Sequence, residues 1–278
     1  MRPTKKACLI VLPLLFLAIA ASGALAQQPP GPHFRYVRMF PVSAPPAQYE
    51  VVHLILDFAP GAWTPEHFHG GDAFVTVLEG EVTRREGDKE DAYGPGETFR
   101  EAAGVHHAAG NEGTANARVM ASILLSPGAP VTVNVPGKPA PAILPTSSFL
   151  SRTTFGTQPA EFNLTQVVVD FVPGAYIPWH VHGGPGIATV IQGDIIFDTP
   201  GGEQRRGPGG IFIDATAPHD ARNVGSGNAT VIVTFLIKKG APVTTFVDAP
   251  GQAARLPAST GVITPPSTGD AGLLLCAR

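Results

Sequence analysis

The chain carries two copies of one sequence pattern at a fixed distance. The segment 57–62, which reads Asp-Phe-Ala-Pro-Gly-Ala, recurs at 170–175 as Asp-Phe-Val-Pro-Gly-Ala, and Gly80 recurs as Gly193. Every one of these matches has the same offset of 113 residues, which drops to 112 in the later part of the repeat. Solenoid repeats have periods of roughly 20–50 residues. A repeat of this length therefore predicts a domain that has been duplicated.

Each copy contains three histidines at a spacing that suits a metal ion. Two of them form a His-x-His pair, and residues i and i+2 of a strand point to the same face. The third follows roughly 40 residues later. Neutral imidazole is a common metal ligand, and three histidines around an open position form a known catalytic arrangement. The alternative, that these are ordinary surface or core histidines or inert remnants, explains the recurrence of the whole triplet less well. The predicted ligands are His67, His69 and His107 in one site and His180, His182 and His219 in the other.

Short apolar segments between turn residues predict an all-β fold. The segments 74–78 and 187–191 are rich in β-branched residues and are bounded by glycines, and 119–125 and 231–236 are similar. The chain has 32 glycines and 29 prolines but only 15% charged residues, which favours short strands and tight turns. No long segment shows a helical period. We therefore expect a β-sandwich or β-barrel in each half.

The rest of the chain divides into connections and ends. Residues 1–26 have a basic start, an apolar stretch and an Ala-Leu-Ala site, which together predict a secretory signal and a secreted or periplasmic protein. A membrane anchor is the alternative, but the apolar stretch is shorter than the roughly 20 residues that a bilayer needs. The other predicted segments are an N-terminal arm (27–45), a first domain (46–135), a linker (136–158), a second domain (159–247) and a flexible C-terminal tail (248–278).

Charge and cysteine content exclude several classes of protein. The net charge of −3 offers no footprint for nucleic acid, and no segment after the signal could span a membrane. Cys8 lies in the signal, so Cys276 alone cannot form an intrachain disulfide. The expected partner is a small-molecule substrate. The sequence leaves open whether the chain forms a homo-oligomer.

The histidine pattern resembles the cupin superfamily. Its first signature runs Gly, five residues, His-x-His, three or four residues, Glu, six residues, Gly, and both repeats match it except at the glutamate. Its second signature ends Gly-x-x-His-x-x-x-Asn, which Gly104, His107 and Asn111 match, while the second repeat has Thr216 in place of the glycine. The resemblance implies a bicupin, with two tandem jelly-roll β-barrels that each hold a metal ion.

Both repeats lack the glutamate that this resemblance would supply as a fourth ligand. Its place falls on Ala73 and Gly186, which cannot bind a metal. Asp72 is adjacent, but neighbouring residues of a strand face opposite ways. We therefore predict three-histidine sites without a carboxylate. Such a neutral ligand set would attract an anionic chelator, and nitrogen ligands suit Fe, Cu, Zn or Ni as the divalent transition metal.

The predicted function is dioxygenase-type oxidation of a small aromatic or enolisable compound that chelates the metal through oxygen. Three-histidine cupins, among them quercetinase-like enzymes, are similar in this respect. No base is evident, so catalytic residues are left unassigned. The alternatives are a non-catalytic metal- or ligand-binding cupin and a Zn-dependent isomerase or hydrolase. We expect unequal sites, with the first more active because Asp72 and His106 add polar groups. His53 is interpreted as a surface or edge residue.

Overall fold

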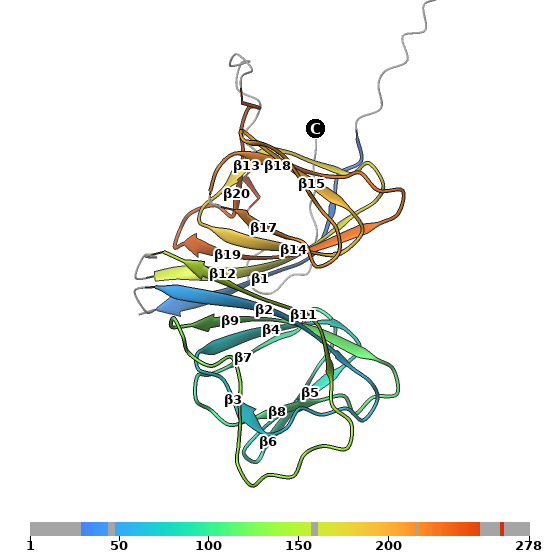
Figure 1. The fold of residues 1–278 in the computed structure, drawn as a ribbon, viewed down its shortest axis with the longest axis vertical. Helices are drawn as coiled ribbons and strands as arrows, with labels where there is room; N and C mark the ends of the chain where they lie inside the picture. The colour runs from blue at the N-terminus through green and yellow to red at the C-terminus, as the bar shows by residue number, and fades with distance from the viewer. Residues whose placement is uncertain (1–28, 44–47, 157–160, 215, 251–261, 264–278) are drawn as a thin grey trace, which may run out of the picture.

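The protein forms two β-barrels that stack along its long axis (Figure 1). The computed structural model describes residues 29–43, 48–156, 161–214, 216–250 and 262–263. Every regular element within these ranges is a strand, which confirms the predicted all-β class with two tandem barrels. None of the described residues forms a helix that is long and apolar enough to cross a membrane. The predicted signal, both cysteines and most of the predicted tail lie outside the described ranges.

The first barrel combines a five-stranded sheet with two smaller ones. Its strands are β2 (Tyr49–Phe58), β3 (His67–Phe68), β4 (Asp72–Glu79), β5 (Val82–Glu86), β6 (Lys89–Tyr93), β7 (Thr98–Glu101), β8 (Ala108–Gly110), β9 (Ala117–Leu125), β10 (Val133–Asn134) and β11 (Thr146–Phe155). The five-stranded sheet has the order β11-β2-β9-β4-β7, and the smaller sheets are β6-β5-β8 and β10-β3. All strand pairs are antiparallel, as expected for a jelly roll.

The second barrel repeats this plan with a five-stranded and a six-stranded sheet. Its strands are β1 (His33–Ser43), β12 (Glu161–Phe171), β13 (Tyr176–His182), β14 (Gly186–Gln192), β15 (Ile195–Thr199), β16 (Gly202–Arg206), β17 (Ile211–Asp214), β18 (His219–Asn223), β19 (Ala229–Lys238), β20 (Thr244–Phe246) and β21 (Val262–Ile263). The two sheets have the orders β1-β12-β19-β14-β17 and β16-β15-β18-β13-β20-β21.

The two repeats exchange their first strands. β1 precedes the first barrel in the chain but pairs with β12 of the second, and β11 precedes the second repeat but pairs with β2 of the first. The two pairings have equivalent registers, since His33 faces Asp170 and Thr146 faces Asp57. The segments predicted as an arm (27–45) and a linker (136–158) thus contain β1 and β11. Each barrel is completed by a strand from the other repeat (Figure 1).

Equivalent turns adopt equivalent backbone conformations in both repeats. Gly61 and Gly174 have φ of 76° and 75° in the turn before the histidine pair. Gly104 has φ of 73°, and at the equivalent place Thr216 has φ of 67°. A β-branched residue is strained in this left-handed region, where glycine is not. The second repeat therefore keeps the turn although it has lost the glycine.

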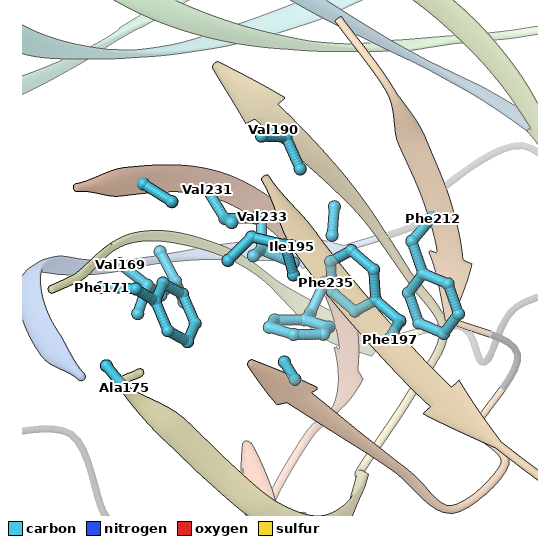
Figure 2. Close-up of a cluster of buried hydrophobic side chains, with 14 of the residues drawn as sticks. Val169, Phe171, Ala175, Val190, Ile195, Phe197, Phe212, Val231, Val233 and Phe235 are labelled. Carbon is cyan, nitrogen blue, oxygen red and sulfur yellow. The ribbon is translucent and has the colours of Figure 1, made fainter. Parts of the chain in front are cut away.

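The barrel interiors differ in their aromatic content. The core of the second barrel contains Phe171, Phe197, Phe212 and Phe235 among valines and isoleucines (Figure 2). The corresponding core of the first barrel contains Phe58 as one of only two phenylalanines in that cluster. This difference bears on the cavity around each histidine triad.

The five-stranded sheets face each other across a buried interface that carries a polar network. His53 is fully buried there, with its ring nitrogens against Thr189 and Thr234 of the second barrel. Our interpretation of His53 as a surface or edge residue was therefore wrong. Burial lowers the pKa of His53 to about 3, so the ring is neutral. The polar face of a strand with alternating polar and apolar residues can pack against another sheet as well as face water. The sequence around His53 therefore did not distinguish a buried interface from the surface.

The network has approximate two-fold symmetry. Gln166 takes the place of His53 in the second repeat, and it bonds Thr76 and Ser122 of the first barrel. Ser122 in turn lies 2.7 Å from Thr234, which joins the two halves of the network. Buried polar groups that are left unpaired are costly, so this network favours one register of the two sheets.

Candidate metal centres

Each barrel brings its three predicted histidines together. The nitrogens of His67, His69 and His107 all lie within 4.8 Å of one another, and so do those of the second triad. Strand pairing explains this convergence. His67 lies opposite His107, and His180 lies opposite His219, in antiparallel bridges. The backbone thus fixes the geometry that the spacing predicted.

A second set of hydrogen bonds fixes the orientation of every ring. The Nδ1 atom of His67 lies 2.8 Å from the Pro65 carbonyl oxygen, and that of His69 lies 2.6 Å from the Val131 carbonyl oxygen. The other four histidines make the same kind of contact with backbone carbonyls. A carbonyl only accepts, so each Nδ1 must carry the hydrogen. In the neutral rings the Nε2 lone pairs are therefore left to face the centre of each triad.

A buried carboxylate lies beside each triad, which the sequence interpretation did not foresee. Glu101 Oε2 lies 3.1 Å from His69 Nε2, and Glu101 Oε1 lies 3.2 Å from His107 Nε2. In the second barrel Asp214 Oδ2 lies 3.3 Å from His182 Nε2 and 3.9 Å from His219 Nε2. The family's glutamate is absent from its usual place, but the prediction that no carboxylate is present must be corrected.

Strand register explains where these carboxylates come from. Ala73, at the place of the family's glutamate, pairs across the sheet with Glu101, and Gly186 pairs with Asp214. Directly opposite residues on one sheet face are close neighbours. A carboxylate on the adjoining edge strand thus reaches the space that a longer side chain on the central strand would fill. Glu101 and Asp214 have the repeat offset of 113 residues, so the signal was present in the sequence.

Packing explains why the second repeat has glycine at position 186. A Cβ atom at Gly186 would lie 2.3 Å from Cδ1 of Phe235, its partner on β19. The equivalent pair in the first repeat is Ala73 and Ile123. The larger ring therefore takes the space that the missing methyl group leaves.

Burial favours the neutral form of three of the histidines. It lowers the pKa of His67 and that of His180 to about 4, in each case with help from the neighbouring third histidine, and it lowers the pKa of His182 well below the usual value. The charged form of a buried imidazole loses its solvation, which is the physical cause. Neutral imidazole is the form that binds a metal.

The two carboxyls differ in their electrostatics. Burial would raise the pKa of Glu101, but hydrogen bonds with His107 and His69, which need a proton in the place that a metal ion would take, outweigh this and hold the pKa below the usual range. Burial raises the pKa of Asp214 to about 6 against the weaker opposing effect of a histidine. The first site therefore contains a carboxylate that stays ionised, and the second contains one that can exchange a proton near neutral pH.

The polar atoms of each site fit a bound cation. The inward Nε2 atoms and the carboxylate oxygens are all acceptors, so they cannot bond one another without a proton or a metal ion between them. Among the described residues, the buried atoms His107 Nε2 and Asp214 Oδ2 have no hydrogen-bond partner. Metal–nitrogen and metal–oxygen bonds of about 2.0–2.2 Å would place such ligand atoms about 3 Å apart. The separations of 3.1 and 3.2 Å between Glu101 and its two histidines agree with this, whereas Asp214 lies 3.3 and 3.9 Å from its histidines.

Two polar residues expected near the first site lie elsewhere. Asp72 accepts hydrogen bonds from Arg100, at 2.5 Å, and from the backbone of Ala103. The side chain of His106 is 53% exposed, and its ring stacks on Phe68. Neither residue lines the cavity at the triad. The reason we gave for a more active first site is therefore not met.

Both triads open into cavities inside the barrels. The first cavity has a volume of about 200 Å³, and its lining includes Thr64, Asn134 and Glu101. The second has a volume of about 120 Å³ and an almost entirely apolar lining that includes Phe34 and Phe246. Each could admit a small molecule to the open side of a bound metal.

Sequence comparison identifies one family in both halves. The profile described as "Cupin domain" matches residues 54–123 and 167–235. A search of curated protein sequences finds no significant match.

Structural comparison finds proteins of similar fold at low sequence identity. Oxalate decarboxylase from Bacillus subtilis at pH 4.6 has a TM-score of 0.51 at 14% identity, with 74% of each chain covered. A structure of the same enzyme from a study of its Mn(II) centres has a TM-score of 0.51 at 14% identity, covering 74% of this chain and 75% of that one. AerE from Microcystis aeruginosa has a TM-score of 0.46 at 15% identity, covering 74% of this chain and 99% of that one.

Proposed function

Because this chain belongs to the cupin family, we propose that each of its domains binds one divalent transition metal and that the protein is a dioxygenase-type oxidoreductase. The observation that carries the proposal is the arrangement of six inward Nε2 atoms in two triads, each ring held by a backbone carbonyl. Rings that are merely packed in a core have no need of a shared orientation toward one point. The proposed ligands are His67, His69 and His107, and His180, His182 and His219.

The donor sets narrow the choice of metal. Imidazole suits Fe, Cu, Zn and Ni, and a carboxylate also admits Mn. The B. subtilis oxalate decarboxylase that shares this fold has Mn(II) centres. When bound, a redox-active ion of this group would supply the electron exchange that a reaction with O₂ needs. We propose Fe, Mn or Cu for activity and Zn for a site that only binds.

The carboxylates supply two different functions. Glu101 lies at ligand-like distances from two histidines of its site, so we assign it as a fourth donor there. Asp214 lies farther from its histidines, with one oxygen held by the backbone N–H of Thr216 at 2.8 Å. Its free oxygen is placed to accept a proton from a hydroxyl group of the substrate. We therefore propose Asp214 as the base that the sequence left unassigned.

The cavity volumes support a small substrate. A molecule of one ring, or an enolisable chain of similar size, fills a cavity of this volume and can present two adjacent oxygens to the metal side. Loss of one proton from such a pair gives an anionic chelator. Dioxygenation then incorporates both atoms of O₂ into that compound.

Export remains part of the proposal. The basic and apolar residues of the segment 1–26 support a signal that is removed outside the cytoplasm. N-terminal sequencing of the protein from its native compartment tests this. A chain that still begins at Met1 would contradict it.

The test of the function is oxygen consumption by defined metal forms. The metal-free protein is loaded with Fe(II), Mn(II), Cu(II) or Zn(II) and mixed with catechol or 2,4-pentanedione in an oxygen electrode. We expect uptake with at least one redox-active metal and none with Zn(II). His67→Ala and His180→Ala should each remove a different fraction of the activity, since the two sites differ.

The control is the protein that carries both substitutions, which should consume no oxygen. If every metal binds and no substrate consumes oxygen, the dioxygenase proposal fails. Conversion of a substrate by the Zn(II) form without oxygen uptake would instead indicate an isomerase or hydrolase. No conversion by any metal form would indicate a binding protein.

A further inference from the structure

We propose that the second site is specific for an aromatic chelator, whereas the first takes a more polar, aliphatic one. This inference rests on the proposed function, because it assumes that a metal holds the oxygens of the ligand. It is carried by differences between equivalent positions of the two cavities. The histidine triads are the same, so only the surrounding side chains can distinguish the ligands.

One pair of equivalent lining residues shows the first difference. Asn134 pairs with His67 across β10 and β3, and its equivalent Phe246 pairs with His180 across β20 and β13. The centroids of the Phe246 and His180 rings lie 6.4 Å apart at an edge-to-face angle of 67°. An amide that can bond a polar ligand is thus replaced by a ring that can pack on an aromatic one.

A similar replacement occurs at a second position of the lining. Thr64 lines the first cavity, and its equivalent Ile177 lines the second. The second cavity is left with few polar groups apart from its triad, namely Asp214 and Thr244. A polar ligand would lose its hydrogen bonds to water there without replacement, which is unfavourable.

The wall of the second cavity is aromatic. Phe197 and Phe212 stack with ring centroids 4.4 Å apart and an angle of 2° between their planes (Figure 2). Phe235 packs against the triad, with its ring centroid 4.1 Å from that of His182. In the first repeat the equivalent of Phe197 is Arg84, whose guanidinium pairs with Glu86 and does not line the first cavity. A charged group in one repeat thus corresponds to a phenyl ring in the other.

The size of the second cavity agrees with a single ring. Its volume is about 120 Å³. An apolar protein cavity of about 150 Å³ binds benzene. A catechol could therefore place its ring among the phenylalanines and turn both oxygens toward the triad and Asp214.

The exchanged strand completes this aromatic site. Phe34 on β1 lines the second cavity, although it precedes the first barrel in the chain. Its equivalent on β11 is Ser147, which does not line the first cavity. The exchange of strands thus adds to the difference between the sites.

The experiment compares the two sites in single-site proteins. The double variant His67→Ala/His69→Ala keeps only the second site, and His180→Ala/His182→Ala keeps only the first. Both are loaded with Zn(II) and titrated with 4-nitrocatechol, followed by absorbance, and with acetohydroxamate, followed by calorimetry. For each site we take the ratio of its affinity for 4-nitrocatechol to its affinity for acetohydroxamate. We expect this ratio to be at least about tenfold higher in the second site than in the first, which corresponds to about 1.4 kcal/mol.

Matched exchanges between the repeats sharpen this test. Phe246→Asn in the second-site protein should lower the ratio about tenfold, and Asn134→Phe in the first-site protein should raise it. The Zn(II) content and the unfolding temperature serve as controls, and Ile177→Thr with Thr64→Ile forms a second pair if one exchange disturbs folding. Equal ratios in the two sites, or ratios that neither pair changes, would overturn the inference.

A metal-independent measurement separates this inference from the proposed function. Phenol, which cannot chelate, is added to the metal-free protein, and its binding is followed by saturation-transfer NMR. We expect a signal that Phe246→Asn weakens and Asn134→Gln leaves unchanged. If neither site binds metal but phenol still shows this pattern, the proposed function fails and the aromatic preference stands. If metal binds but phenol shows no such pattern, the aromatic preference fails.

Discussion

The two barrels hold nearly identical histidine triads in different surroundings. The ring centroids of the His-x-His pair lie 4.9 Å apart in the first barrel and 4.8 Å apart in the second, and the first and third rings lie 4.3 Å apart in both. Backbone pairing sets these distances, so they have not diverged. The carboxylate, its contacts and the cavity lining are set by single side chains, and all of them differ. Ligand geometry is therefore conserved between the halves where the backbone fixes it, while the chemistry around it is free to change.

A glutamate at the family's usual position should affect stability and metal binding very differently in the two repeats, and this is the largest effect we expect. In the second repeat, Gly186→Glu must displace Phe235, and this ring packs against His182. Overpacking and a new buried carboxyl should cost about 3 kcal/mol and empty the second site. Urea unfolding and metal analysis measure both effects.

The first repeat provides the comparison. Ala73→Glu meets no such ring, but it places a second carboxylate opposite Glu101. We expect lower stability without metal, because like charges repel in a buried site, and tighter metal binding at the first site. Adding Phe235→Ile to Gly186→Glu should bring the second site close to this behaviour. If Gly186→Glu alone already binds metal as Ala73→Glu does, the steric account of the glycine is wrong.

Neutralising the carboxyls should change the stability of the metal-free protein in opposite directions. The folded pKa of Asp214 is about 6, which is above its unfolded value, so the native state binds more protons at this group than the unfolded state does. The free energy of unfolding therefore falls as the pH rises from about 4 to 6. Asp214→Asn should therefore stabilise the protein at pH 7, by about 2–3 kcal/mol.

Glu101 has the reverse linkage. Its folded pKa is lowered, so it contributes stability above the unfolded pKa that is lost as the pH falls through the folded pKa. Glu101→Gln should therefore destabilise the metal-free protein at pH 7. Chemical unfolding at several pH values checks both variants. Changes of the same sign for Glu101→Gln and Asp214→Asn would contradict the difference between the two sites.

The interface network should respond to acid through one repeat only. His53 has a folded pKa of about 3, so between the unfolded value near 6.5 and pH 3 the unfolded chain binds more protons and stability falls as the pH falls. His53→Gln introduces the residue that stands at the equivalent position, Gln166. In this variant the decrease in the free energy of unfolding between pH 7 and pH 5 should be smaller by about 2 kcal/mol. The reverse change, Gln166→His, should add a similar loss. A pH dependence that is the same with and without His53 would place its ring in contact with water.

The strained turn should give the smallest effect. Thr216 has φ of 67° where the first repeat has Gly104. Thr216→Gly should stabilise the protein by about 1 kcal/mol, and Gly104→Thr should destabilise it by a similar amount. Thermal unfolding of both variants measures the pair. If Gly104→Thr is neutral, then this turn tolerates a β-branched residue in either repeat.

The sequence predicted the features that depend on regular spacing. The constant offset identified the duplication, and alternation along a strand brought His67 and His69 to one side. The third histidine of each triad followed from the family's second signature. These predictions succeeded because backbone geometry alone turns such spacing into proximity.

The features that were missed depend on pairing between distant strands. The exchange of β1 and β11 could not be inferred, because their sequences share no pattern that marks them as equivalent. Glu101 and Asp214 do share the repeat offset, but they differ in residue type and lie outside the first signature. Only the register that places Glu101 beside Ala73 shows that a carboxylate reaches the site.

The number of metal ions bound per chain decides whether both histidine triads are metal centres. The protein is purified from its native compartment without chelators, and its metal content is measured by elemental analysis beside His67→Ala and His180→Ala. We expect about two divalent transition-metal ions per wild-type chain and about one in each variant, with the loss confined to the altered barrel. A wild-type chain without bound metal, or variants that keep the full content, would contradict the assignment of the two triads as metal centres.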